Sequence, residues 1–376
     1  MIRAGEAERR RLNQLFDELC RIPSPFGRER ACAERVGAEL RSLGLEVEED
    51  DAGQTTGAEC GNLLARMPGT AERTVLLCAH VDTVVPQAPI EPHVLDGGWV
   101  NAHEGILGAD NKAAVAVILE LARRYTTDGP PVGLELLFTV SEENALVGAK
   151  AFDVGRLRSD FGYVFDHATP IGEIVVASPT YYRIDADFRG TAAHAGIRPE
   201  EGRSAIAAAA HAVAAMRLGR VDEETTANVG RIEGGSASTN VVPERCRVEA
   251  ETRSVDDGKV EAMVSEMVDH LQDAANAGQC DLDVKVEKKF QGYRTRPGAP
   301  AVQAAEVALR KCGYEPRRIV TGGGSDANAF QAAGLSCVNL ANGTERNHEP
   351  GERVSVAALE GMLDVALALV DAAAAC

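Results

Sequence analysis

The segment Thr74-Val-Leu-Leu-Cys-Ala-His-Val-Asp-Thr-Val84 decides the fold class of this 376-residue chain. Residues 74–79 form a short apolar run, which is typical of a strand buried on both faces of a sheet. His80 and Asp82 follow this run directly, so polar side chains begin where the strand is expected to end.

Further buried strands and helices alternate on both sides of this segment. Strands are predicted over 132–140 and 161–165, and helices over 6–21, 29–43, 112–125 and 299–312. This alternation predicts an α/β fold with a mostly parallel central sheet. Ligands of such sheets bind beyond the carboxyl ends of the strands. Glu142, Glu143 and Asp166 follow the predicted strands, and therefore point to a site at that edge.

The pattern changes between residues 179 and 291. Alternating segments predict half-exposed strands over 181–188, 246–252 and 281–290, with helices over 203–218 and 261–276. This order predicts a small α+β sandwich with one polar sheet face. We therefore expect two domains: a main domain of residues 1–178 and 292–376, and an inserted domain of residues 179–291.

Composition excludes several classes of partner. The formal net charge is −18 and no block of Lys or Arg stands out, which disfavours nucleic acid and anionic membranes. Nine cysteines without a C-x-x-C pair favour a reducing compartment. The first residues lack the apolar core of a signal peptide, and no apolar run is long enough to span a bilayer. We expect a soluble, cytoplasmic protein.

Five polar clusters carry the candidate chemistry. They are residues 80–84 (HVDTV), 108–112 (GADNK), 141–143 (SEE), 165–167 (FDH) and 347–349 (NHE). Mixed imidazole and carboxylate ligands suit zinc, manganese or cobalt better than calcium, which prefers oxygen ligands. The clusters therefore predict a site for divalent transition-metal ions.

The ligand count is sufficient for two ions. Asp110 can bridge them, with His80 and Asp166 on one ion and Glu143 and His348 on the other. Two ions about 3.5–4 Å apart polarise a carbonyl and lower the pKa of a shared water toward about 7.

Glu142 is predicted to be the general base. Successive residues of an extended segment point in opposite directions, so Glu142 can stay unligated when Glu143 binds metal. Asp82 is placed to orient His80 through its second ring nitrogen. His103 and His167 flank the clusters, and their contribution stays open. A single His-x-Asp or Glu-Glu pair is more often solvated surface than a metal site. The prediction therefore depends on all five clusters together.

The clusters resemble, in order and spacing, the motifs of the M20 family of co-catalytic metallopeptidases, in particular its peptidase T-like (tripeptidase) branch. Residues 190–202 (GTAAHAGIRPEEG) resemble the lid signature of that branch. The resemblance covers nearly the whole chain. It implies a zinc-peptidase-like catalytic domain with an inserted lid, and the metal-ligand roles given above.

The resemblance also implies roles for further residues. His194 would stabilise the oxyanion, and Asn240 and Arg253 would bind the substrate's carboxylate. Gly323 and Gly324 would permit close approach of the substrate to the backbone. Related tripeptidases carry an Arg before a Gly-Gly-Thr-Asp loop, whereas residues 320–326 here read VTGGGSD. This departure leaves the selection of peptide length open.

The sequence therefore predicts a two-zinc peptidase, with cobalt or manganese as alternative ions, that releases the N-terminal residue from short peptides. An N-acyl-amino-acid deacylase or dipeptidase on the same fold is the nearest alternative. A non-catalytic metal-binding scaffold is disfavoured, because Glu142 and the ligands are retained. A homodimer through the lid is a further expectation from the resemblance.

Overall fold

The computed structural model of the protein describes residues 3–168 and 170–375. The chain divides into two compact units, one of Met1–Ala177 with Arg294–Cys376 and one of Ser178–Tyr293. The second unit is therefore inserted into the first, and each is described by itself below.

A nine-stranded sheet forms the centre of the first unit. Its strands are β1 (Val47–Glu49), β2 (Leu63–Met67), β3 (Thr74–His80), β6 (Gly133–Thr139), β7 (Phe161–His167), β8 (Glu173–Ser178), β14 (Tyr293–Arg294), β15 (Arg317–Val320) and β16 (Cys337–Ala341). Their order is β1-β2-β6-β3-β7-β16-β8-β14, with β15 beside β8. The central pairs β6–β3, β3–β7 and β7–β16 are parallel, which confirms the predicted mostly parallel sheet.

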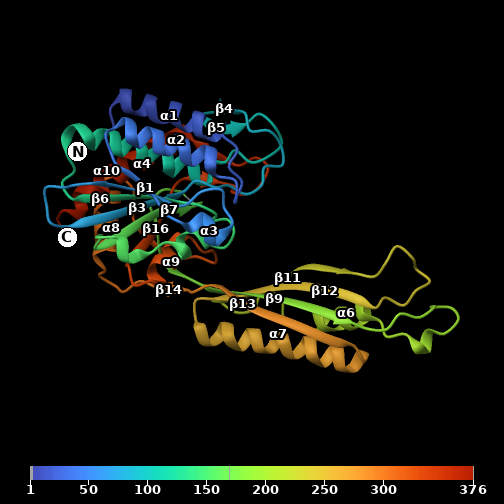
Figure 1. Ribbon diagram of the computed structural model, residues 1–376. Helices are drawn as coiled ribbons and strands as arrows, with labels where there is room; N and C mark the ends of the chain where they lie inside the picture. Colours follow the sequence, from blue (N-terminus) through green and yellow to red (C-terminus); the bar gives the residue numbers. More distant parts are fainter. Residues whose placement is uncertain (1–2, 169, 376) are drawn as a thin grey trace. The chain divides into compact units, whose positions relative to one another are not determined.

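Helices cover both faces of this sheet. They are α1 (Glu6–Cys20), α2 (Arg30–Ser42), α3 (Ala52–Thr56), α4 (Ala109–Asp128), α5 (Val147–Ala151), α8 (Pro300–Cys312), α9 (Asp326–Ala332) and α10 (Val356–Ala373), with a short 3-10 turn at Val154–Arg156. Figure 1 shows α1, α2 and α4 on one side of the sheet and α9 on the other. Because both faces are covered, β3 and β6 are buried along almost their whole length, as their apolar sequences require.

A second, four-stranded antiparallel sheet lies in the same unit. It consists of β4 (Pro92–Leu95), β5 (Gly98–Asn101), β17 (Thr344–Glu345) and β18 (Arg353–Ser355). The loop between β17 and β18 carries His348, and β18 runs directly into α10.

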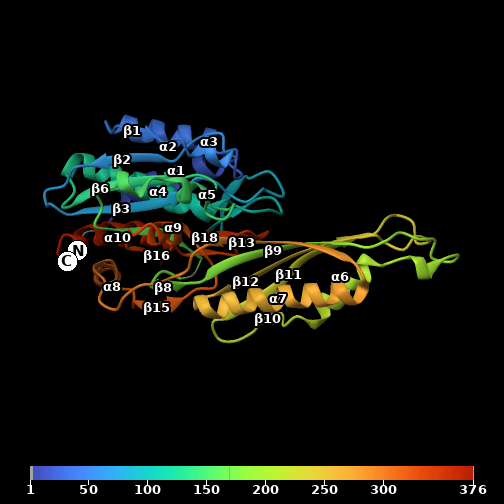
Figure 2. The same ribbon diagram turned by 60° about the horizontal axis from the view of Figure 1, so that its bottom comes forward.

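The second unit is a single antiparallel sheet with two helices on one face. Its strands β9 (Thr180–Arg189), β10 (Gly219–Arg220), β11 (Thr225–Gly234), β12 (Arg245–Ser254) and β13 (Asp281–Phe290) follow the order β10-β11-β12-β9-β13. The helices are α6 (Ala205–Ala215) and α7 (Asp257–Gly278), with a 3-10 turn at Pro199–Glu201. Figure 2 shows α7 lying along the strands. The apolar residues of the strands pack under the helices, and the opposite face is lined by charged side chains.

Two further observations concern the whole described chain. The eight cysteines within the described residues are all free. None of the described helices combines the length and apolar character needed to cross a membrane.

Candidate active site

The predicted metal ligands gather at one edge of the main sheet, where three neighbouring strands end. β3 ends at His80, β6 leads into the turn 141–143, and Asp166 lies near the end of β7. These strands run parallel, with His80 opposite Thr139 in the pairing of β3 and β6. Their carboxyl ends therefore fall at the same edge, as the sequence predicted.

Two more ligands reach this edge from other segments. Asp110 lies at the start of α4, where its backbone departs from helical geometry (φ −83°, ψ 104°) and the peptide bond to Asn111 is cis. His348 comes from the loop between β17 and β18 and has a positive φ of 67°. A non-glycine residue in this region is uncommon, so the surrounding contacts hold His348 in place.

The Asp110 carboxylate lies between the two histidines. Its Oδ1 is 3.4 Å from His80 Nε2, and its Oδ2 is 3.2 Å from His348 Nε2. His80 Nε2 is also 3.4 Å from Asp166 Oδ1, and His348 Nε2 is 2.8 Å from Glu143 Oε1. The predicted bridging carboxylate thus has one predicted ligand pair on each side.

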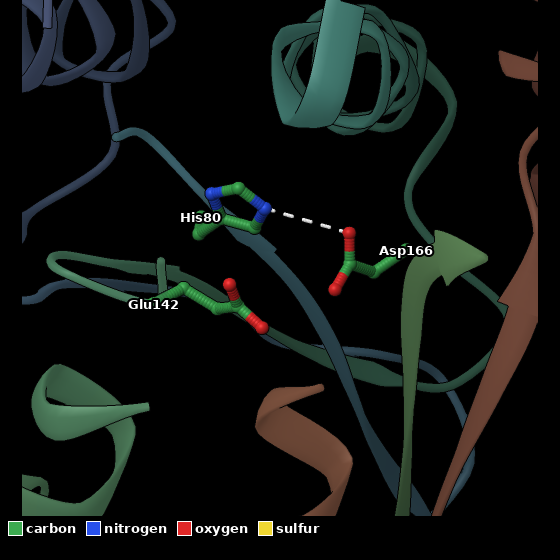
Figure 3. Close-up of side chains that lie close together, drawn as sticks. All are labelled: His80, Glu142 and Asp166. Atoms are coloured by element: carbon green, nitrogen blue, oxygen red, sulfur yellow. Dashed lines mark ion pairs between the residues drawn. The ribbon is translucent and has the colours of Figure 1, made fainter. Parts of the chain in front are cut away.

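The donor set fits divalent metal ions. Two groups have ligand atoms within 4.8 Å of one another: His80 with Glu142 and Asp166, and His80 with Asp110 and Glu143. Figure 3 shows the first group, with the three side chains directed into a common space. Asp110 Oδ1 is buried without a hydrogen-bond partner among the described residues, which is costly unless a cation binds there. Mixed imidazole and carboxylate donors are the ligands that zinc takes.

The carboxylates make positive charge favourable at both histidines. Burial alone would lower the pKa of His80, but its contacts with Asp110 and Asp166 outweigh burial and raise that pKa well above its ordinary value. Asp110 and Glu143 raise the pKa of His348 to about 10. A cation at this edge is therefore stabilised electrostatically.

Glu142 lies in the same crowded space. Burial, followed by the charge of Asp166, raises the pKa of the Glu142 carboxyl. Only 8% of Glu142 is exposed, and no described residue donates a hydrogen bond to its carboxylate. Its side chain is therefore available to a metal ion, a water or a substrate, and its role as general base stays a prediction.

Asp82 makes more contacts than the sequence predicted. Its Oδ1 is 3.4 Å from His80 Nδ1, although this nitrogen lies closer to the backbone oxygen of Asp82, at 3.0 Å. The two carboxylate oxygens accept the backbone N–H groups of Glu142 and Glu143, each at 3.0 Å. Asp82 therefore fixes the turn of the candidate base as well as the His80 ring.

Two buried acids at this edge were not predicted. Glu29 Oε1 accepts the N–H of Gly27 at 2.6 Å and, from Ser141, the N–H at 3.1 Å and the hydroxyl at 2.7 Å. Asp326, at the start of α9, accepts the hydroxyl of Thr139 at 2.5 Å, and burial raises its pKa to about 6. Asp326 follows the glycine loop quoted above, but no sequence signal distinguishes Glu29 from a surface residue at a helix start.

The predicted lid residues His194 and Asn240 lie on two neighbouring loops of the second unit. Ala195 donates its N–H to the backbone oxygen of Asn240 at 2.8 Å, and His194 forms a β-bridge with Val241. His194 Nδ1 accepts the N–H of Gly196 at 3.2 Å. Because Nδ1 accepts this bond, Nε2 is the ring nitrogen left to donate a hydrogen bond, as an oxyanion contact requires.

Arg253 lies near the opposite end of the same sheet. Its guanidinium stacks on the Tyr181 ring at 4.3 Å and donates to Glu251 at 3.1 and 3.2 Å. Arg253 pairs with Tyr181, whereas the loop of His194 begins after Arg189, eight residues further along β9. At about 3.3 Å per residue these ends lie roughly 26 Å apart. Within one lid, Arg253 therefore lies far from the loop of His194, although the resemblance assigns both residues to the substrate site.

The glycine loop between β15 and α9 has open space beside it. A Cβ added at Gly323 would meet only the Thr321 hydroxyl, at 3.7 Å. Gly323 and Gly324 are half-buried, and the Gly323 N–H donates to Thr321 Oγ1 at 3.1 Å. The packing of the chain itself therefore does not require glycine at position 323, and the approach of a substrate to this backbone stays a prediction.

The two histidines left open by the sequence lie outside the candidate ligand groups among the described residues. His103 forms an exposed ion pair with Glu91 at 3.3 Å. His167 is half-buried, and burial lowers its pKa.

Comparisons with known proteins match both units. The M20 family model described as a peptidase dimerisation domain matches residues 180–279, and the model of peptidase family M28 matches residues 62–167. The uncharacterised protein YqjE of Bacillus subtilis (strain 168) is 37% identical over 97% of this chain and 99% of its own length.

Solved structures are similar over the same extent. The crystal structure of aminopeptidase PepT from Bacillus cereus has 39% identity and a TM-score of 0.88, covering 97% of this chain and 99% of its own. That of a tripeptidase from Staphylococcus aureus has 35% identity and a TM-score of 0.93, covering 98% and 99%.

Divalent ions are expected to stabilise the protein, because they neutralise carboxylates that burial forces together. At a free zinc concentration 100 times the dissociation constant of each wild-type site, the free energy of unfolding should rise by about 2.7 kcal/mol for each bound ion. Chemical denaturation with and without zinc measures this gain. Asp110→Asn should reduce it, and an equal gain in that variant would remove Asp110 from the metal centre.

Proposed function

The chain belongs to the M20 family of metallopeptidases, in its peptidase T-like branch, and we propose from this that it is a two-zinc aminopeptidase that releases the N-terminal residue of tripeptides and other short peptides. The observation that carries the proposal is the position of Asp110 between His80 and His348, with further carboxylates on both sides. The two similar solved structures, an aminopeptidase and a tripeptidase, support the choice of substrate.

We propose the division of ligands that the sequence predicts. His80 and Asp166 would hold one ion, Glu143 and His348 would hold the other, and Asp110 would contribute to both. Bound zinc would polarise the scissile carbonyl and make water at the site more acidic.

The residues of the chain then move protons and stabilise charge. Glu142 takes a proton from the attacking water and delivers it to the leaving amine. Asp82 keeps Glu142 in position by holding its backbone N–H. His194 donates a hydrogen bond from its Nε2–H group to the oxyanion that forms at the carbonyl. Arg253, Asn240 and the backbone at Gly323 and Gly324 are the proposed contacts for the rest of the peptide.

The distances within one lid support a homodimer. A fully extended tripeptide spans about 11 Å, less than half of the roughly 26 Å between the two ends of the lid sheet. His194 and Arg253 of one lid therefore cannot both contact one short peptide. Two copies joined through their lids would let one site take these residues from different chains, and the match of the lid to a dimerisation domain supports this.

The free thiols agree with a reducing, cytoplasmic compartment.

Product identity tests the proposed reaction. Leu-Gly-Gly should yield leucine and Gly-Gly, because the free amino end is the one that is released. Blocking that amine by acetylation should abolish turnover. Chromatography of the products decides the matter: Leu-Gly and glycine would indicate a carboxypeptidase, and faster turnover of N-acetyl-amino acids would indicate a deacylase.

Glu142→Gln should lower kcat by about 10²–10⁴-fold, because the variant cannot accept the proton of the attacking water. Bound metal, measured by elemental analysis, should stay at the wild-type level. Glu143→Gln is the matched control on the next residue, and it should lose metal as well as activity. Turnover by Glu142→Gln at the wild-type rate would refute the proposed base.

His194→Ala should lower kcat by about 10²–10³-fold through loss of one oxyanion donor, with metal content unchanged. His211→Ala, on the exposed face of α6 in the same unit, provides a control that should keep wild-type kinetics. Steady-state kinetics on the same tripeptide measures both variants. An unchanged kcat in His194→Ala would exclude this residue from the reaction.

A further inference from the structure

Glu352 is a buried carboxylate that the proposed metal centre and mechanism do not use. It lies four residues after His348, at the start of the segment that leads into β18, and only 1% of it is exposed. Its Oε2 accepts the backbone N–H groups of Leu107 and Gly108, both at 2.8 Å. Its Oε1 accepts the N–H of Asp110, also at 2.8 Å.

These N–H groups belong to the start of α4, where a helix cannot satisfy its own donors. The local sequence supplies no side-chain cap, since the N-cap position is Gly108 at φ 75°. Asp110 and Asn111 are also non-helical, so the first turn lacks regular geometry. Glu352 replaces the missing cap from 242 residues away, and its negative charge favours the positive end of the helix dipole.

The same carboxylate connects two predicted metal ligands. Asp110 is held directly through its N–H, and His348 belongs to the segment that Glu352 anchors. Within that segment, the N–H of Glu352 donates to the backbone oxygen of Glu349 at 3.1 Å. His348 Nε2 then lies 3.2 Å from Asp110 Oδ2, although the two residues are 238 positions apart. By holding the residues before β18 against the start of α4, Glu352 therefore sets the distance between His348 Nε2 and Asp110 Oδ2.

We propose that Glu352 is a positioning residue that holds the Asp110 carboxylate and the His348 segment in register, and so determines the affinity of the ion shared by Asp110, Glu143 and His348. This inference rests on the proposed two-metal function and adds a residue to it. Glu352 forms no hydrogen bond or ion pair with His80 or Asp166, so the ion proposed for these two residues depends on Glu352 only through Asp110.

Glu352→Gln tests the inference with little change of shape. A glutamine retains one acceptor oxygen and turns an amide N–H₂ toward the remaining backbone donors, so at least one N–H loses its partner. We expect one of two zinc affinities, measured by titration calorimetry, to fall by about 10–100-fold. The other should change less. Added zinc should restore peptidase activity, which a merely misfolded variant would not show.

Glu135→Gln is the matched control. Glu135 is also 1% exposed and accepts two backbone N–H groups, from Arg158 and Ser159, but neither of these residues is a candidate metal ligand. It should lose stability while keeping both zinc affinities. If Glu352→Gln fails to fold, Glu352→Asp retains the charge but shortens the reach, and should show the same selective loss.

The outcomes separate the inference from the function on which it rests. Wild-type zinc affinities in the folded Glu352 variants, with Asp110→Asn impaired, would overturn the role of Glu352 and leave the metal centre intact. An equal loss in Glu135→Gln would also overturn it, because the effect would then follow from stability alone. Absence of zinc binding in the wild-type protein would overturn both proposals.

Discussion

The structure depends on one electrostatic constraint: several carboxylates are buried together at the carboxyl edge of three parallel strands. Buried like charges are costly in a medium of low dielectric constant unless cations or hydrogen bonds compensate them. Burial and mutual repulsion accordingly raise the pKa of Glu142 and Asp166. Two histidines compensate only part of this charge, and divalent ions bound there would compensate the rest. The fold thus buries more negative charge at this edge than its own histidines compensate.

Three further acids maintain this arrangement without occupying a ligand position. Asp82 and Glu29 accept N–H groups of the turn 141–143, and Glu352 accepts those at the start of α4. Each acid comes from a segment distant in sequence, so the ligand-bearing turns are held from several directions. Such support places catalytic groups before substrate arrives, which is the condition for efficient chemistry at a fixed site.

Much of the fold could be predicted from the sequence, because buried strands and amphipathic helices leave clear patterns. The strand β13 occupies residues 281–290, as its alternation predicts. The helix α10 was not predicted, since it is buried around most of its circumference and shows no narrow apolar stripe. The candidate ligands His80, Asp110, Glu143 and Asp166 could be named because each follows a predicted strand or precedes a predicted helix. The structure brings them together, and their division between two ions is a proposal.

The supporting acids could not be found in this way. Glu29 and Glu352 bind backbone N–H groups, and a backbone partner leaves no trace in residue type or spacing. The separation of His194 from Arg253 could not be predicted either, because it follows from the length of β9 and β12 and not from any motif.

Anomalous diffraction at the zinc absorption edge would locate bound zinc in crystals of the protein. We expect two peaks about 3.5–4 Å apart, one beside His80 and Asp166 and one beside Glu143 and His348, with Asp110 close to both. A single peak, or a pair of peaks away from Asp110, would contradict this expectation.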